Sequence, residues 1–204
     1  MPAMATLEQI HARDGELIQI IESAVAESAR RSGSWVVCRP GCTPCCLEPF
    51  AITWLDAQRL RRGLDGLNAS DPLRAEAVRL RAVRYAAAIA PVYPGDPATG
   101  ALHDEDAMPA GWEDKPCPAL DPASGLCDLY DARPVTCRVF GAATRIDNGA
   151  VGACELCYEG ATDEQISACA TVADPNGEEQ ALLAERSQPN TIVAFALTVS
   201  GEMK

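Results

Sequence analysis

Residues 38–46 read Cys-Arg-Pro-Gly-Cys-Thr-Pro-Cys-Cys, so four thiols occur within nine residues. Six more cysteines follow: Cys117, Cys127, Cys137, Cys154, Cys157 and Cys169. A tetrahedral zinc holds thiolate sulfurs at about 2.3 Å, so loops that carry such ligands must turn tightly. Pro40, Gly41 and Pro44 favour tight turns, because proline presets φ and glycine permits conformations that other residues avoid. This stretch therefore predicts a cysteine loop organised by metal.

An even number of cysteines is also compatible with a disulfide framework. Disulfide-stapled domains are usually secreted and much shorter than 204 residues. The N-terminus has no basic segment followed by an apolar stretch, as a signal peptide would have. The longest apolar run, residues 192–199, is too short to span a bilayer. We therefore expect a cytoplasmic protein without a membrane segment, in which the thiols stay reduced and available to metal.

The formal net charge of −12 bears on the choice of partner. Nucleic-acid backbones and anionic membranes attract basic surfaces, so this charge argues against both. The chain also has no phosphate-binding glycine loop, no dinucleotide fingerprint and no HExxH motif. Metal ions are therefore the partners that the sequence predicts, and it names no substrate, protein partner or oligomeric state.

Helical periodicity predicts a small, single-domain, mainly α-helical fold with irregular, metal-organised cysteine loops. The first helix is expected over residues 6–32, where Thr6 and Gln9 can form a capping box and Gly33 is a stop signal. We expect three parts: this N-terminal helix within residues 1–35, a cysteine-cluster metal-binding domain over 36–160, and a C-terminal tail, 161–204, packing on that domain.

Two further helices are expected inside the cysteine-cluster domain. One begins at Thr53 and stops at Gly66, and the next starts at Ser70-Asp71-Pro72 and ends before Pro91. The apolar side chains that line this next helix are Leu73, Val78, Leu80 and Val83. The remaining expectations are helices near 163–172 and 177–186, a short strand or turn at 126–131, and a strand or helix at 191–199.

The segment 91–126 breaks the helical pattern, because prolines and glycines fill it. A long structureless loop inside a compact domain needs an external organiser, and metal bound by Cys117 and Cys127 could supply one.

Cys45 and Cys46 are adjacent, and neighbours in an extended backbone point to opposite sides. We therefore expect these two cysteines to serve two centres or to bridge a multinuclear one.

The number of thiols leaves the kind of centre open. Eight or nine ligands fit two mononuclear four-thiolate sites, or an iron–sulfur cluster together with one mononuclear site. Cys169 has no cysteine nearby in the sequence, and we expect it to be a buried structural thiol on a helix.

Charged and aromatic residues flank the cysteines. Arg39, Arg133 and Arg138 could offset the negative charge of a thiolate site. Tyr130 and Phe140 are expected to pack over the site as an apolar shell.

The cysteine motifs resemble those of the YkgJ-type cysteine-cluster family, a zinc- or iron-chelating domain. The resemblance is carried by the run at 38–46, by Cys-Pro-Ala-Leu at 117–120 and by Gly-Leu-Cys-Asp-Leu-Tyr-Asp-Ala-Arg-Pro-Val-Thr-Cys-Arg-Val-Phe-Gly at 125–141, and it covers roughly residues 36–160. The family pattern has one further cysteine downstream, where this chain offers two. The ligands that the resemblance implies are Cys38, Cys42, Cys45, Cys46, Cys117, Cys127, Cys137 and either Cys154 or Cys157.

The leading hypothesis is a metal-binding protein that holds zinc or iron, including an iron–sulfur cluster, through clustered thiolates. One alternative is a redox or group-transfer enzyme that uses an iron–sulfur cluster, and another is a metal or redox sensor or a metallochaperone. A similar cluster motif occurs in flagellin lysine N-methylases, so the resemblance leaves open whether the chain is an enzyme.

Overall fold

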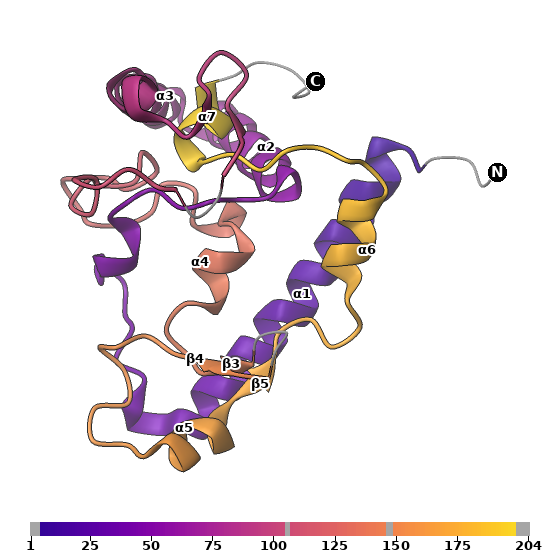
Figure 1. Ribbon diagram of the computed structural model, residues 1–204, viewed down its shortest axis with the longest axis vertical. Coiled ribbons are helices and arrows are strands. Elements are labelled where there is room, and N and C mark those ends of the chain that lie inside the picture. Colours follow the sequence, from indigo (N-terminus) through magenta and orange to yellow (C-terminus); the bar gives the residue numbers. More distant parts are fainter. Residues whose placement is uncertain (1–4, 105–106, 146–148, 199–204) are drawn as a thin grey trace. The chain divides into compact units, whose positions relative to one another are not determined.

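The computed structural model describes residues 5–104, 107–145 and 149–198 (Figure 1). The predicted mainly α-helical fold is confirmed, with long helices and only short strands. The chain forms two compact units, which we call the α1 unit (1–39 and 135–187) and the α2–α3 unit (40–134 and 188–204). Among the described residues, no helix is both long enough and apolar enough to cross a membrane.

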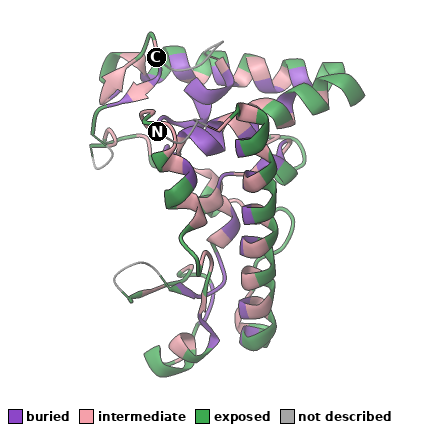
Figure 2. Cartoon of the chain, turned by 90° about the vertical axis from the view of Figure 1, so that its right-hand side faces the viewer, coloured by how far each residue is buried: buried purple, intermediate pink, exposed green. Residues whose placement is uncertain are grey.

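The α1 unit is built on helix α1, Leu7–Ser32. The predicted capping box is present: Gln9 N donates to Thr6 Oγ1 at 3.2 Å and Thr6 N donates to Gln9 Oε1 at 2.9 Å. Gly33 ends the helix at a φ of 56°, as predicted. Buried residues lie along one side of α1 and exposed residues along the other (Figure 2). Helix α6, Glu178–Ala184, packs on α1.

A small sheet and two short helices complete the α1 unit. The strands are β3 (Thr144–Arg145), β4 (Val151–Gly152) and β5 (Thr171–Val172), with β3 in the centre, antiparallel to β4 and parallel to β5. The helices are α4 (Val135–Val139) and α5 (Asp163–Cys169), and a 3-10 turn, η1, spans Gly33–Trp35. The helix expected near 163–172 therefore ends early, because residues 171–172 pair with β3 instead.

The α2–α3 unit packs three helices together: α2 (Trp54–Ser70), α3 (Pro72–Ile89) and α7 (Val193–Thr198). The expected stop of α2 at Gly66 is wrong. The helix continues for one more turn, in which Asp71 N donates to Leu67 O at 2.7 Å. The break comes at Asp71-Pro72 because Asp71 caps α3, with its side chain accepting from Arg74 N at 3.1 Å.

The buried face of α3 also differs from the prediction. Leu73, Leu80 and Val83 are 85%, 47% and 54% exposed, and only Val78 of the predicted apolar side is buried. The other buried residues of this helix are Ala75, Ala82, Ala86 and Ile89. Helices approach one another closely where side chains are small, so packing against α2 and α7 selects this alanine-rich face.

Segment 91–126 begins with a 3-10 turn, η3 (Ala90–Val92), and a two-stranded ladder, β1 (Gly95–Asp96) with β2 (Ala101–Leu102). Tyr93 from this segment packs against Phe195 of α7, with ring centroids 4.5 Å apart.

The ambiguous segment 191–199 forms one bridge, Ile52↔Thr191, and then α7, while Val199 lies outside the described residues. Two 3-10 turns, η2 (Pro44–Cys46) and η4 (Tyr130–Ala132), carry cysteine-loop residues.

Two glycines of α2 provide a test of this packing. A Cβ added at Gly63 would lie 2.3 Å from the Cβ of Ala132 in η4, whereas a Cβ at Gly66 would meet nothing within 4 Å. Gly63→Ala should lower the free energy of unfolding by roughly 1–3 kcal/mol, because overpacking forces the backbone to shift. Gly66→Ala should raise it by up to about 1 kcal/mol, because alanine favours the helix. Denaturant unfolding followed by far-UV circular dichroism measures both, and equal effects would contradict the contact between α2 and η4.

Candidate metal centre

All ten cysteines lie among the described residues, and none of them is joined in a disulfide there. Each unit contains five of them. The α1 unit holds Cys38, Cys137, Cys154, Cys157 and Cys169, and the α2–α3 unit holds Cys42, Cys45, Cys46, Cys117 and Cys127. Within the described parts of the chain, no group of three or more His, Cys, Asp or Glu side chains stands in a ready-made metal-binding arrangement.

Cys45 and Cys46 do not lie in extended backbone. They lie in the η2 turn, which closes with a hydrogen bond from Cys46 N to Thr43 O at 2.8 Å. In this turn the thiol of Cys46 donates a hydrogen bond to the sulfur of Cys45. The extended backbone that was assumed is therefore absent here, because Pro44 starts a turn, while the expectation that the two cysteines serve two centres or bridge a multinuclear one stays a prediction.

Cys117 and Cys127 lie on the two arms of a hairpin, residues 117–128, which we call the cysteine hairpin. Its register is set by the bridge Leu120↔Cys127 and by Asp121 N, which donates to Leu126 O at 2.8 Å. The segment 126–131, expected as a strand or turn, is thus the second arm followed by η4. Cys117 N donates to Cys46 O at 2.7 Å, so the hairpin is joined directly to the η2 turn.

The charge interactions among these thiols show that they are near one another. The hydrogen bond to Cys45 is the largest cause that raises the pKa of Cys46, followed by burial and by the charges of Cys45, Cys117 and Cys127. The same hydrogen bond lowers the pKa of Cys45 to about 6. Burial raises the pKa of Cys117 to about 12 and also raises the pKa of Cys127. Four thiolates cannot share this space without a cation, so the donor set fits a metal ion.

Arg133 supplies positive charge to this group, as predicted. Its charge lowers the pKa of both Cys45 and Cys127, acting against burial at each. Arg59 of α2 holds the backbone of Arg133: its Nη1 donates to Arg133 O at 3.4 Å and also to Asp56 Oδ1 at 2.6 Å. Because Arg59 and Asp56 are buried, the start of α2 fixes the turn that carries Arg133.

The aromatic residues do not form the predicted apolar shell. Tyr130 and Phe140 are 58% and 51% exposed. The guanidinium of Arg133 lies 3.5 Å from the ring centroid of Tyr130, so this ring supports a cation instead. Arg138 is buried and pairs with Glu22 of α1. The guanidinium of Arg138 is therefore paired with a carboxylate, whereas the sequence suggested that it offsets the charge of thiolates.

In the α1 unit, the sulfurs of Cys38 and Cys157 lie 3.9 Å apart. A tetrahedral zinc with bonds of about 2.3 Å has sulfur–sulfur edges of about 3.8 Å, so this pair fits two corners of such a site. Gly141 allows the approach: at a φ of 111°, a Cβ there would lie 2.7 Å from the sulfur of Cys38. Cys137 lies on α4, and Cys154 is joined through its N–H to Gly141 O at 3.4 Å.

Tyr158 holds Cys157 in place, and the sequence analysis did not identify it. Its buried hydroxyl lies 2.6 Å from Ser32 Oγ and accepts from Ala143 N at 2.7 Å, while Tyr158 N donates to Trp35 O at 3.0 Å. Tyr158 adopts a backbone φ of 62°, a value that residues other than glycine rarely adopt. Neither the hydroxyl partners nor the dihedral leaves a signal in a single sequence.

Cys169 is the last residue of α5 and is 5% exposed. It packs in a core with Ala143, Cys157, Tyr158 and Ala170. The prediction of a buried thiol on a helix is confirmed.

The family model CxxCxxCC, described as a putative zinc- or iron-chelating domain, matches residues 37–171. The chain belongs to this family. The match covers more than half of the chain and includes all ten cysteines, which confirms the resemblance drawn from the motifs. The search of curated proteins found no match, and neither did the search of solved structures.

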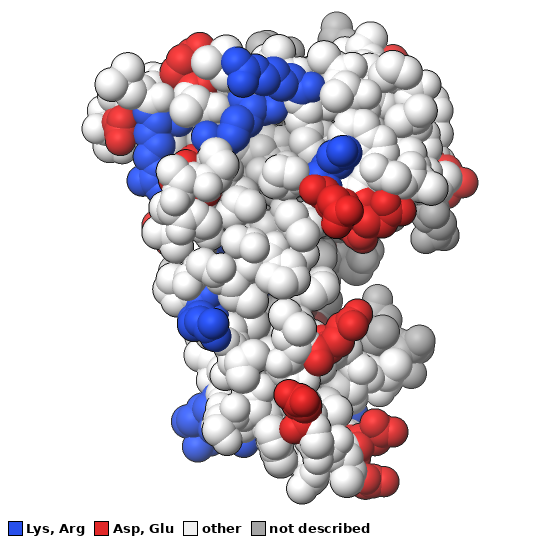
Figure 3. Space-filling model, turned by 90° about the vertical axis from the view of Figure 1, so that its left-hand side faces the viewer, with Lys and Arg blue, Asp and Glu red and all other residues white. Residues whose placement is uncertain are grey.

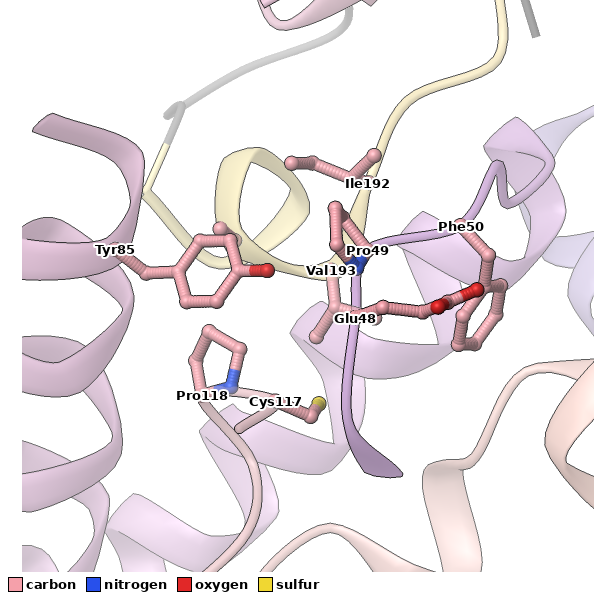
Figure 4. Close-up of a pocket in the computed structure, with 9 residues that line it drawn as sticks. Glu48, Pro49, Phe50, Tyr85, Cys117, Pro118, Ile192 and Val193 are labelled. Atoms are coloured by element: carbon pink, nitrogen blue, oxygen red, sulfur yellow. The ribbon is translucent and has the colours of Figure 1, made fainter. Parts of the chain in front are cut away.

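Within this chelating domain, a small pocket adjoins Cys117. Tyr85 from α3, together with Cys117 and Pro118, lies on one side, and Glu48, Pro49 and Val193 lie on the other (Figure 4). Glu48 has a φ of 56°, a strained conformation for a residue other than glycine. Burial raises the pKa of the Tyr85 phenol, and the charges of Cys117 and Glu48 raise it further. The pocket therefore places a neutral phenol and a carboxylate beside a candidate ligand.

The anchoring of Cys157 can be tested at Tyr158. Tyr158→Phe should lower the free energy of unfolding of the chelating domain by roughly 1–3 kcal/mol, because Ala143 N loses its buried acceptor. Tyr130→Phe is the matched control, since Tyr130 is more than half exposed and phenylalanine still stacks with Arg133. Its effect should stay within about 0.5 kcal/mol. Chemical denaturation under reducing conditions measures both, and an unchanged Tyr158→Phe protein would show that the hydroxyl does not anchor the loop.

Proposed function

We propose that the chain binds zinc or iron through thiolates of its clustered cysteines and that the bound metal organises the cysteine loops. The observation that carries this proposal is the meeting of the η2 turn and the cysteine hairpin within one unit, through Cys117 N and Cys46 O. Membership of a zinc- or iron-chelating family supports it. The proposed ligands are Cys38, Cys42, Cys45, Cys46, Cys117, Cys127, Cys137, Cys154 and Cys157.

The proposed ligands of the α2–α3 unit form a four-thiolate set. Cys46 interacts electrostatically with Cys45, Cys117 and Cys127, and four thiolates suffice for a structural zinc or for an iron–sulfur cluster. Cys42 lies between Gly41 and Thr43, which both approach Gly125 at the tip of the hairpin. We assign Cys42 to the same unit as a further candidate ligand.

The proposed ligands of the α1 unit start from the pair Cys38 and Cys157. The separation of their sulfurs fits an edge of a tetrahedral site, and Cys137 and Cys154 are candidates for the other corners. Between the two downstream candidates that the family motif leaves open, we favour Cys157, because its sulfur faces Cys38. Cys169 has a packing role in this proposal.

The identity of the metal is tested by anaerobic purification, elemental analysis and an absorbance spectrum of the same sample. We expect stoichiometric zinc or iron. A visible band that bleaches with reductant would assign an iron–sulfur cluster, and a colourless protein with zinc would assign zinc thiolates. Protein purified from metal-supplemented cells with less than one equivalent of either metal would contradict the proposal.

Cysteine variants test the ligand choice. Cys157→Ser should reduce the metal content of the purified protein, because serine is a poor ligand for zinc and iron where a thiolate is required. Cys154→Ser should reduce it less, and Cys169→Ser should leave it unchanged, because Cys169 is buried in the core. Elemental analysis of the three variants and the wild type measures how much metal each protein retains. If Cys154→Ser loses metal and Cys157→Ser does not, the assignment of Cys157 is wrong.

One observation favours a second candidate function, a redox or group-transfer enzyme. The small pocket beside Cys117 adjoins a candidate metal ligand, and it offers the phenol of Tyr85 and the carboxylate of Glu48 as polar groups (Figure 4). This candidate requires an iron–sulfur cluster or a metal with an open coordination position. A colourless zinc protein whose metal ligands are all thiolates would argue against it.

A further inference from the structure

Arg81 of α3 contacts both arms of the cysteine hairpin. Its Nε donates to Pro118 O at 2.8 Å, and its Nη2 pairs with Asp128 Oδ2. Pro118 follows Cys117 by one residue, and Asp128 follows Cys127 by one residue. A single guanidinium therefore holds each arm at the residue next to its thiol.

Asp128 is the buried centre of this contact. Its side chain is 2% exposed, and it also pairs through Oδ1 with Arg74, two turns before Arg81 on the same face of α3. The backbone N of Asp128 donates to Ala119 O at 2.8 Å, so the residue belongs to the ladder of the hairpin as well. A carboxylate that is buried between two arginines fixes its surroundings strongly, because losing one partner leaves a buried charge that only the other arginine compensates.

The helix that carries the two arginines is rigidly placed. Ala75, Val78 and Ala82 of α3 are completely buried and lie between Arg74 and Arg81 or beside Arg81 in the sequence. Ligands that are positioned from packed helices keep their geometry better than ligands held only by their own loops. Arg81 therefore connects the residues next to the two hairpin thiols to the helical core of the α2–α3 unit.

We propose that Arg81, acting through Asp128 and the carbonyl of Pro118, is a positioning residue that sets the separation of Cys117 and Cys127 before metal binds. This inference rests on the proposed function. Hydrogen-bond partners outside the ligand set of metal sites orient the ligands, and their loss typically weakens metal binding about 10–100-fold. The geometry of Arg81 is the important property in this role, because a lysine ammonium cannot span two acceptors as a planar guanidinium does.

The test compares Arg81→Gln, Arg81→Lys and Asp128→Asn with a matched control, Arg79→Gln. Arg79 lies on the same helix and donates to Asn68 Oδ1 at 2.9 Å, away from the hairpin. Zinc affinity is measured by competition with a chromogenic chelator, and Co²⁺ substitution reports ligand geometry through its visible spectrum. We expect the three hairpin variants to bind zinc about 10–100-fold more weakly and to shift the Co²⁺ bands. The control should bind within about twofold of the wild type, since Arg79 pairs with Asn68 and Glu76, which lie outside the hairpin.

Two results would overturn the inference. Wild-type affinity and an unchanged Co²⁺ spectrum in Arg81→Lys would show that positive charge suffices and that no positioning occurs. Unchanged metal binding in Arg81→Gln, with only a lowered melting temperature, would show a purely structural role. The double variant Arg81→Gln/Asp128→Asn should lose less affinity than the sum of the two single losses, because both substitutions remove the same Arg81–Asp128 contact.

Failure of this inference differs from failure of the proposed function. If the wild-type protein itself binds neither Zn²⁺ nor Co²⁺ through thiolates, the proposed function fails, and Arg81 has no metal site to position. If the wild type binds both ions and the hairpin variants bind them equally well, only the role of Arg81 is wrong.

Discussion

Repulsion between neighbouring thiolates is the constraint on which the cysteine loops of the α2–α3 unit depend. Cys46 stands near Cys45, Cys117 and Cys127, and burial together with these neighbours favours the neutral thiol. A divalent metal at the proposed site would remove this repulsion and replace a costly group of charges with metal–sulfur bonds. The loops that hold these cysteines have little regular structure, so their order and the occupancy of the site are expected to be coupled.

Arginine provides the second means of balancing this charge. The chain is acidic overall, with a formal net charge of −12, yet Lys and Arg side chains lie at several places on the face shown in Figure 3, most closely grouped in its upper part. Arg133 acts on Cys45 and Cys127, and Arg81 acts on Cys117. The guanidinium groups also hold backbone carbonyls of the loops, so they combine electrostatic and positional roles in a way that lysine does not.

The sequence predicted the metal-binding motif and the helices well, because both depend on local signals. Thiol spacing is visible in one chain, and the capping boxes at Thr6 and Thr53 form from residues three positions apart. The buried face of α3 was predicted wrongly, because a leucine such as Leu80 indicates burial only when a neighbour covers it. Packing against α2 and α7 favoured small residues there, and that choice depends on partners distant in the chain.

By itself, the sequence determined that this chain is a mainly helical member of the CxxCxxCC family, with ten cysteines in the matched segment. Only the tertiary structure decided which cysteines meet. The η2 turn brings Cys45 and Cys46 together where an extended chain would separate them, and Tyr158 holds Cys157 opposite Cys38. The η2 turn closes through a local hydrogen bond from Cys46 N to Thr43 O, whereas the bonds that hold Tyr158 join residues far apart in the sequence. Such bonds form only after the helices have packed, and no local pattern encodes them.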